Sequence, residues 1–256
     1  MVGTSLPRSR HVVDLAHEIT DGMVTYPGIP APALGSHLTF DESADHYAPG
    51  TEFTIGMITL STNTGTYLDT PAHRYRTGED LAALPLDRLV DLDGVVVRAA
   101  DAVAAARDAG GPPAIDAPAL TELLGAATAA PTSATAATAG LTGRAVLVDT
   151  GHARHWGTEA YFADHPYLTA AAADWLVDQG VALVGIDSLN IDGTAGGARP
   201  VHTRLLAAGI PVVEHLTGLD RLPRTGFRFS AAPPKVAGLG TFTVRAFAVV
   251  DGPPPG

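Results

Sequence analysis

Residues 63–73 bring together side chains that can move protons and bind cations. The stretch reads Asn-Thr-Gly-Thr-Tyr-Leu-Asp-Thr-Pro-Ala-His and contains Tyr67, Asp69 and His73. A histidine transfers protons near neutral pH, and a nearby carboxylate can orient it. A lone histidine is more commonly a surface or hydrogen-bonded residue, so this stretch alone does not establish a catalytic role. Pro71 argues against a helix between Asp69 and His73.

A second pair of titratable residues lies later in the chain. His202 precedes two leucines, and Glu214, twelve residues further on, precedes Leu-Thr-Gly-Leu-Asp. The two stretches together resemble the cyclase/kynurenine formamidase family of metal-dependent hydrolases. His215 is adjacent to Glu214 on a predicted strand, so we expect its side chain to point to the other face.

The first stretch is similar to the family motif His-x-Gly-Thr-His-x-Asp-x-Pro-x-His. The positions that match are Gly65, Thr66, Asp69, Pro71 and His73. Asn63 and Tyr67 stand where the motif has its two leading histidines. Other family landmarks follow in order: Asp14-Leu15 with Tyr26-Pro27-Gly28, Asp149-Thr150-Gly151-His152, and Gly185-Ile186-Asp187-Ser188. The resemblance therefore covers nearly the whole chain.

The resemblance implies a role for each matching site residue. In the family, the histidines and the aspartate of the first motif hold a divalent ion, and the later histidine and glutamate complete the site. By that analogy Asp69, His202 and Glu214 are ligand positions, and His73 is the acid/base. Because Asn63 and Tyr67 replace two imidazoles, we predict that there is no catalytic metal cofactor. The alternative is one Zn²⁺ or Mn²⁺ ion on the three ligand positions.

Without a metal, these groups suit proton transfer next to a carbonyl group. The family includes ring-forming cyclases of aromatic polyketide pathways. We therefore predict a cyclase that closes a ring in a polyketide-like polycarbonyl substrate. The predicted catalytic residues are His73, Asp69, Glu214 and His202. The residues predicted to bind the substrate are Asn63, Tyr67, Thr66, His152, Tyr26 and Trp156.

Two other hypotheses stay open. One is an amide or lactone hydrolase of the kynurenine formamidase type that uses the divalent ion. The other is a catalytically inactive protein that binds a ligand or serves as a scaffold.

Composition excludes several classes of protein. The net charge of −11 argues against nucleic acid or an anionic membrane as a partner. There is no cysteine, which excludes disulfides and thiolate chemistry, and no Gly-x-Ser-x-Gly elbow of a serine hydrolase. No apolar run is long enough to span a membrane. We expect a cytoplasmic enzyme with a small-molecule substrate, and the excess of arginine over lysine indicates a high-GC source such as an actinobacterium.

The chain patterning predicts one α/β domain over residues 1–256. Strands are expected at residues 12–15, 53–60, 94–99, 144–149, 181–186, 211–215 and 241–250, and helices at 118–125, 169–180 and 202–208. An Ala/Thr-rich loop is expected at about 126–140 and a flexible tail at 251–256. The resemblance adds a mixed sheet of the swivelling β/β/α type and a homodimer or homotetramer.

Overall fold

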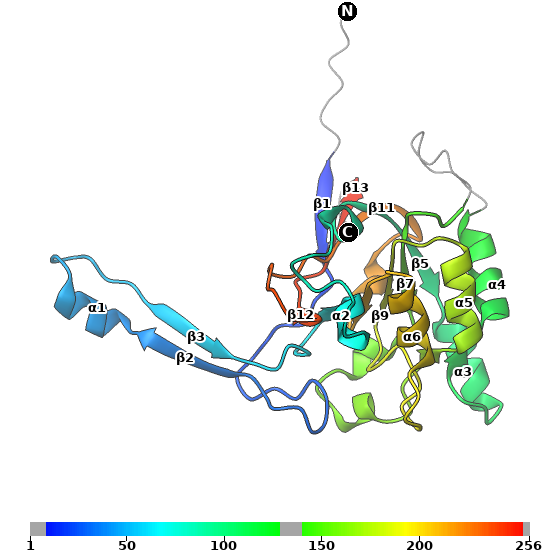
Figure 1. The fold of residues 1–256 in the computed structure, drawn as a ribbon, viewed down its shortest axis with the longest axis horizontal. Coiled ribbons are helices and arrows are strands. Elements are labelled where there is room, and N and C mark those ends of the chain that lie inside the picture. Colours follow the sequence, from blue (N-terminus) through cyan, green and yellow to red (C-terminus); the bar gives the residue numbers. More distant parts are fainter. Residues whose placement is uncertain (1–8, 129–139, 253–256) are drawn as a thin grey trace, which may run out of the picture.

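A nine-stranded mixed β-sheet forms the centre of the protein (Figure 1). The computed structural model describes residues 9–128 and 140–252. The strands of the sheet are β1 (Arg10–Asp14), β4 (Tyr67–Asp69), β5 (Leu92–Arg98), β7 (Ala145–Asp149), β9 (Leu183–Ile186), β10 (Val212–Glu214), β11 (Thr225–Ser230), β12 (Thr241–Thr243) and β13 (Phe247–Asp251). The helices are α1 (Phe40–His46), α2 (Pro71–Arg74), α3 (Ala100–Asp108), α4 (Ala117–Thr128), α5 (Ala170–Asp178) and α6 (Pro200–Ala207). The predicted α/β fold with a mixed sheet is confirmed.

The centre of the sheet is parallel and is buried on both faces. Strands β5, β7, β9 and β10 pair in parallel, in that order. Val95 and Val97 of β5 pack with the helices α3 to α6, whereas Val96 joins the apolar cluster on the other face. Burial on both faces explains why these strands are nearly continuous apolar runs in the sequence.

The sheet is strongly curled, as the order of its strands requires. Across the sheet the order is β1-β13-β11-β5-β7-β9-β10-β4-β12, so β12 and β13 lie near opposite ends. Only Val244 to Ala246 connect these two strands, and such a link spans at most about 14 Å. The two ends of the sheet must therefore approach each other.

The prediction of one closing strand at residues 241–250 is therefore wrong. The alternation of apolar residues continues through the link, but β12 pairs with β4 whereas β13 pairs with β11 and β1. Alternation reports which side chains are buried and carries no information about the partner strand.

Other predicted elements are confirmed. The edge strand is β1, and the helix that starts at Thr169 is α5, where the Thr169 hydroxyl accepts a hydrogen bond from the Ala172 N–H. Residues 126–128 belong to α4 and not to the predicted loop. The rest of that loop, to residue 139, and the tail from residue 253 lie outside the described residues.

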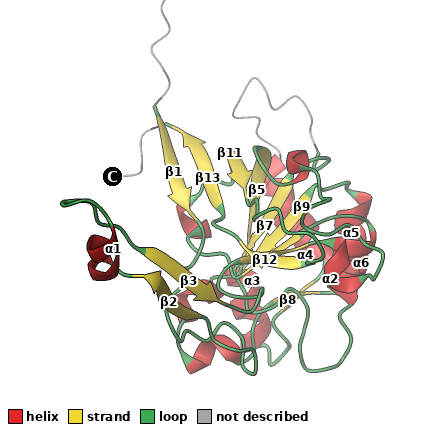
Figure 2. Ribbon diagram, turned by 60° about the vertical axis from the view of Figure 1, so that its left-hand side comes forward, coloured by secondary structure: helices red, strands yellow, loops and turns green. Residues whose placement is uncertain are grey.

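A long hairpin arm projects from this body (Figure 1 and Figure 2). It comprises residues 33–59: β2 (Ala33–Leu38), α1 and β3 (Ile55–Thr59), in which β2 and β3 pair only with each other among the described strands. The strand predicted at 53–60 thus exists, but every residue of β3 is exposed. The alternating pattern there reflects a solvent-exposed ribbon and not a strand of the core.

Two shorter features complete the fold. A second small sheet joins β6 (Ala114–Ile115) to β8 (Tyr167–Leu168), and single 3₁₀ turns occur at Leu86–Arg88, His152–His155, Glu159–Phe162 and Leu219–Arg221. Within the described residues, no helix has both the length and the apolar character needed to cross a membrane.

Candidate active site

The candidate site is built around the short strand β4, which lies between β10 and β12. In the antiparallel register, Tyr67 faces Glu214 on one side and Thr243 on the other, and Asp69 faces Val212 and Thr241. Tyr67 and Asp69 are two residues apart, so their side chains leave the same face of the sheet. The middle of the motif, Tyr67–Asp69, therefore forms a buried strand.

Tyr67 and Glu214 form the first buried contact of the site. The Tyr67 hydroxyl donates to Glu214 Oε2 at 2.6 Å, and the Ile191 N–H donates to Oε1 at 2.6 Å. Burial raises the pKa of Glu214, and the charge of Asp69 adds to this effect whereas His202 opposes it. Burial and the carboxylates of Glu214 and Asp69 raise the pKa of Tyr67 well above its ordinary value. Tyr67 is therefore a protonated hydrogen-bond donor and a poor metal ligand near neutral pH.

The proton on Tyr67 is directed by a chain of buried side chains. Tyr161 contacts His215 Nδ1 at 2.8 Å through its hydroxyl, and His215 Nε2 lies 3.3 Å from the Tyr67 hydroxyl. Because Tyr67 donates to a carboxylate, His215 must donate to Tyr67 through Nε2 and accept from Tyr161 through Nδ1. Burial lowers the pKa of His215 to about 3, so the ring is neutral.

The expectation that His215 points away from the site is wrong. This residue follows the last residue of β10 and has a left-handed backbone with a φ of 57°. The turn ends the strand alternation and brings the ring to within 5.1 Å of the Tyr67 ring, measured between centroids.

A second contact links Asp69, Thr241 and His73. The Thr241 hydroxyl donates to Asp69 Oδ1 and lies 2.6 Å from His73 Nδ1. A hydroxyl has one proton, and here the carboxylate takes it, so His73 must donate to Thr241 through Nδ1. This leaves His73 Nε2 unprotonated and available to accept a proton or bind a cation.

The one-turn helix α2 carries His73 back over Asp69. Pro71 is its first residue, where a missing N–H has no cost, and the helix does not extend back to Asp69, which lies in β4, as expected. Two glycines lie close against the backbone of this helix. A Cβ on Gly240 would lie 2.3 Å from His73 N, and one on Gly78 would lie 2.4 Å from the carbonyl carbon of Pro71.

His202 lies in the first turn of α6 and is held by a carboxylate that the sequence did not indicate. Asp192 accepts from the backbone N–H groups of Val201 and His202 and lies 2.7 Å from His202 Nδ1. The other ring nitrogen, Nε2, lies 3.4 Å from Asp69 Oδ2 and 3.6 Å from Glu214 Oε1. Burial alone would lower the pKa of His202, but Glu214, Asp192 and Asp69 outweigh it and raise that pKa.

These groups fit a single divalent cation. Candidate ligand atoms of Asp69, His73 and His202 lie within 4.8 Å of one another, and Asp69 Oδ2 is buried with no hydrogen-bond partner. One carboxylate and two imidazoles match the usual three protein ligands of a catalytic Zn²⁺ ion. The predicted ligand set of Asp69, His202 and Glu214 shares two of these residues. Both oxygens of Glu214 are already engaged, whereas His73 has a free nitrogen.

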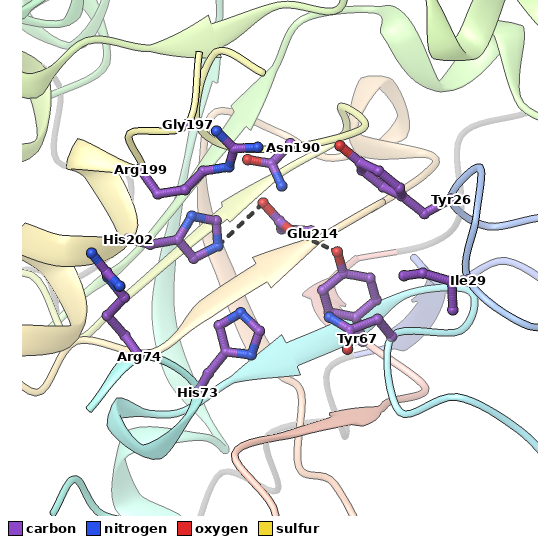
Figure 3. A pocket seen from close by; sticks show the side chains of 11 residues that line it. Tyr26, Ile29, Tyr67, His73, Arg74, Asn190, Gly197, Arg199, His202 and Glu214 are labelled. Carbon is purple, nitrogen blue, oxygen red and sulfur yellow. Dashed lines mark hydrogen bonds and ion pairs between the residues drawn. The ribbon is translucent and has the colours of Figure 1, made fainter. Parts of the chain in front are cut away.

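The four predicted catalytic residues converge, and most of them line one cavity (Figure 3). The cavity has a volume of about 410 Å³. Its lining residues are Tyr26, Ile29, Asn63, Tyr67, His73, Arg74, Asn190, Gly197, Arg199, His202 and Glu214. Asp69 lies beneath this cavity, fully buried. Of the residues predicted to bind the substrate, Tyr26, Asn63 and Tyr67 reach the cavity.

The other three residues predicted to bind the substrate are not among those that line the cavity. Thr66 is buried and donates to the His215 carbonyl. His152 is buried and contacts the Tyr161 carbonyl through Nε2 at 2.9 Å. Trp156 stacks on His17 with ring centroids 3.9 Å apart. The partners of these three side chains are other protein groups; Thr66 and His152 are buried, whereas Trp156 is half-buried.

Comparison with known proteins places this architecture in a family. The family model described as "Putative cyclase" matches residues 13–193. The chain belongs to the Cyclase family. This membership confirms the predicted cyclase/kynurenine formamidase-like resemblance, although the matched region ends before His202 and Glu214. The protein is accordingly an enzyme of the cyclase or hydrolase type.

Relatives can be aligned with this cyclase-family protein over almost its full length. A kynurenine formamidase of Salinibacter ruber is 26% identical, with 95% of this chain and 99% of that protein covered, and one of Erythrobacter litoralis is 22% identical, with 91% of each covered. Isatin hydrolase A of Ralstonia solanacearum has a TM-score of 0.73 at 22% identity, covering 94% of this chain and 92% of that chain. A structure described as a potential metal-dependent hydrolase with cyclase activity has a TM-score of 0.67 at 22% identity, covering 96% of this chain and 100% of that one. The solved structures show that the fold is shared.

Several residues of the site were missed from the sequence. They are Asp192, Thr241, Asn190, Arg74 and Arg199. Two of them had a local signal: Arg74 follows His73 directly, and Arg199 precedes the helix that carries His202. Thr241 reaches the site only through the pairing of β12 with β4, which no local pattern reveals.

We expect the Gly240→Ala substitution to displace α2 and His73. The added methyl group would overlap the backbone of His73, so the free energy of unfolding should fall by about 1–3 kcal/mol. Urea unfolding measures this change. The control is Gly125→Ala, exposed in α4 with open space around the added Cβ, which should raise stability by up to about 1 kcal/mol. Equal stability of the two variants would contradict the close packing of Gly240 against His73.

Proposed function

We propose that this cyclase-family protein hydrolyses an amide or lactone, with one divalent ion held by Asp69, His202 and His73 or Glu214. The observation that carries the proposal is the convergence of Asp69 Oδ2, His202 Nε2 and His73 beside a cavity. Relatives named kynurenine formamidase and isatin hydrolase support hydrolysis over ring closure. A divalent ion bound here would polarise the acyl carbonyl and make a bound water more acidic.

When Glu214 completes the ligand set with Asp69 and His202, His73 Nε2 does not bind the ion and can move the proton. Its Nδ1–H is fixed by Thr241, which is itself fixed by Asp69, so the ring orientation and tautomer are set before the substrate arrives. The free Nε2 can take a proton from the attacking water and return it to the leaving nitrogen or oxygen. The Thr241 hydroxyl, which links His73 to Asp69, thus keeps His73 Nε2 directed toward the cavity.

Tyr67 and Asn63 differ in what they supply. Tyr67 is committed to Glu214 and keeps that carboxylate satisfied in the core. Asn63 lines the cavity, where its amide can donate to a substrate carbonyl oxygen on which negative charge develops. The two replacements remove metal ligands and add hydrogen-bond donors.

The Asn63 amide favours a second candidate function. An amide donor beside a histidine base suits enolisation and aldol-type ring closure of a polycarbonyl substrate, as the sequence predicted. That reaction needs no metal, so its response to metal removal separates it from hydrolysis.

We expect one Zn²⁺ or Mn²⁺ ion per chain in isothermal titration calorimetry. Asp69→Asn and His202→Gln should each weaken binding at least tenfold, whereas the double variant Asn63→His/Tyr67→His adds two imidazoles and should strengthen it at least tenfold. The control is His37→Gln, which removes an exposed histidine of the arm. Unchanged affinity in all variants would contradict a metal site here.

We expect His73→Gln to lower kcat by about 10²- to 10⁴-fold on any amide or lactone that the wild-type protein hydrolyses, because the proton carrier is lost. A panel of aryl formamides and aryl lactones, followed by absorbance in the presence of Zn²⁺ or Mn²⁺, provides the measurement. His46→Gln, which changes an exposed histidine of the arm, should leave kcat unchanged. Full activity of His73→Gln would remove His73 from the mechanism.

A further inference from the structure

Two arginines line the cavity on the elements that carry the proposed catalytic histidines. Arg74 follows His73 on α2, and Arg199 caps α6, which carries His202. Figure 3 shows both on the same side of the cavity as His202, with Tyr26 and Ile29 opposite. In a chain with a net charge of −11, two guanidinium groups at one cavity need an explanation.

The hydrogen bonds of these arginines go to neutral groups. Arg74 Nε donates to the Thr203 hydroxyl at 3.2 Å, and Arg199 donates from one terminal nitrogen to the carbonyls of Gly196 and Ala198, both at 2.8 Å. Within residues 9–128 and 140–252, neither forms an ion pair with a carboxylate, unlike Arg98 or Arg228. Both therefore keep N–H donors available to a bound molecule.

The acidic groups of the site have partners other than these two arginines. Asp192 and Asp69 face His202, and Glu214 accepts from Tyr67 and Ile191. A guanidinium presents a planar set of donors that matches a carboxylate. Among the other lining side chains, Tyr26 and Ile29 suit an aromatic or apolar body of the ligand.

We propose that the substrate is an aromatic carboxylic acid with an acyl-amide or acyl-ester substituent, whose carboxylate is bound by Arg74 and Arg199. This inference rests on the proposed hydrolysis and names its substrate class. Water adds across the acyl bond: the carbonyl carbon gains the oxygen, the bond to nitrogen or oxygen breaks, and the leaving atom takes a proton. The carboxylate is not altered.

The test compares 2-formamidobenzoate with its neutral methyl ester on the metal-loaded protein. We expect kcat/KM to favour the acid by at least tenfold, and Arg74→Gln/Arg199→Gln to abolish that preference by lowering kcat/KM for the acid. The control is Arg76→Gln, an exposed arginine that does not line the cavity and should keep the preference. Equal rates for acid and ester in the wild-type protein would overturn the anion site and leave the proposed hydrolysis standing.

If neither compound is hydrolysed, the proposed function fails on this panel, and binding still decides the anion site. Calorimetry with benzoate and benzamide should then show tighter binding of benzoate, lost in the double variant. Equal binding of the two compounds would overturn the anion site.

Discussion

The site depends on placing two buried carboxylates against one imidazole nitrogen. Asp69 and Glu214 lie 3.4 and 3.6 Å from His202 Nε2, and Asp192 holds the opposite nitrogen of the ring. Buried charges are costly unless each has a partner. In the metal-free protein the raised pKa of His202 supplies a positive charge to this cluster. A divalent ion would supply that charge in place of the proton on Nε2, which explains how one arrangement can satisfy both states.

The curled sheet brings the residues of this cluster together. Strand β4 brings Asp69 and Tyr67 between Glu214 of β10 and Thr241 of β12, and α6 adds His202 from beyond the parallel strands. The replacement of two motif histidines by Asn63 and Tyr67 is accommodated within this frame. Tyr67 closes a buried hydrogen-bond chain from Tyr161 through His215 to Glu214. The substitutions therefore change the donor set of the cavity without leaving its carboxylates unpaired.

The sequence predicted much of this arrangement, and its failures have physical causes. Motif spacing identified Asp69, His73, His202 and Glu214, which the structure brings together, while their roles remain predictions. Apolar runs located the parallel strands because those strands are buried on both faces. The partner change between β12 and β13, the turn at His215 and the contacts of Thr241 and Asp192 are set by tertiary pairing. The contacts of Thr66 and His152 with a substrate were predicted from the family resemblance, whereas both side chains are buried and contact backbone carbonyls.

Anomalous diffraction from crystals soaked in Mn²⁺ or Zn²⁺ tests the central claim most directly. A single anomalous peak bounded by Asp69, His202 and either His73 or Glu214 is the predicted result, and the Asn63→His/Tyr67→His variant should show it at higher occupancy. No peak at this position in well-ordered wild-type crystals, with the side chains arranged as described, would contradict a metal-assisted hydrolase. The acid–base cyclase would then be the function to pursue.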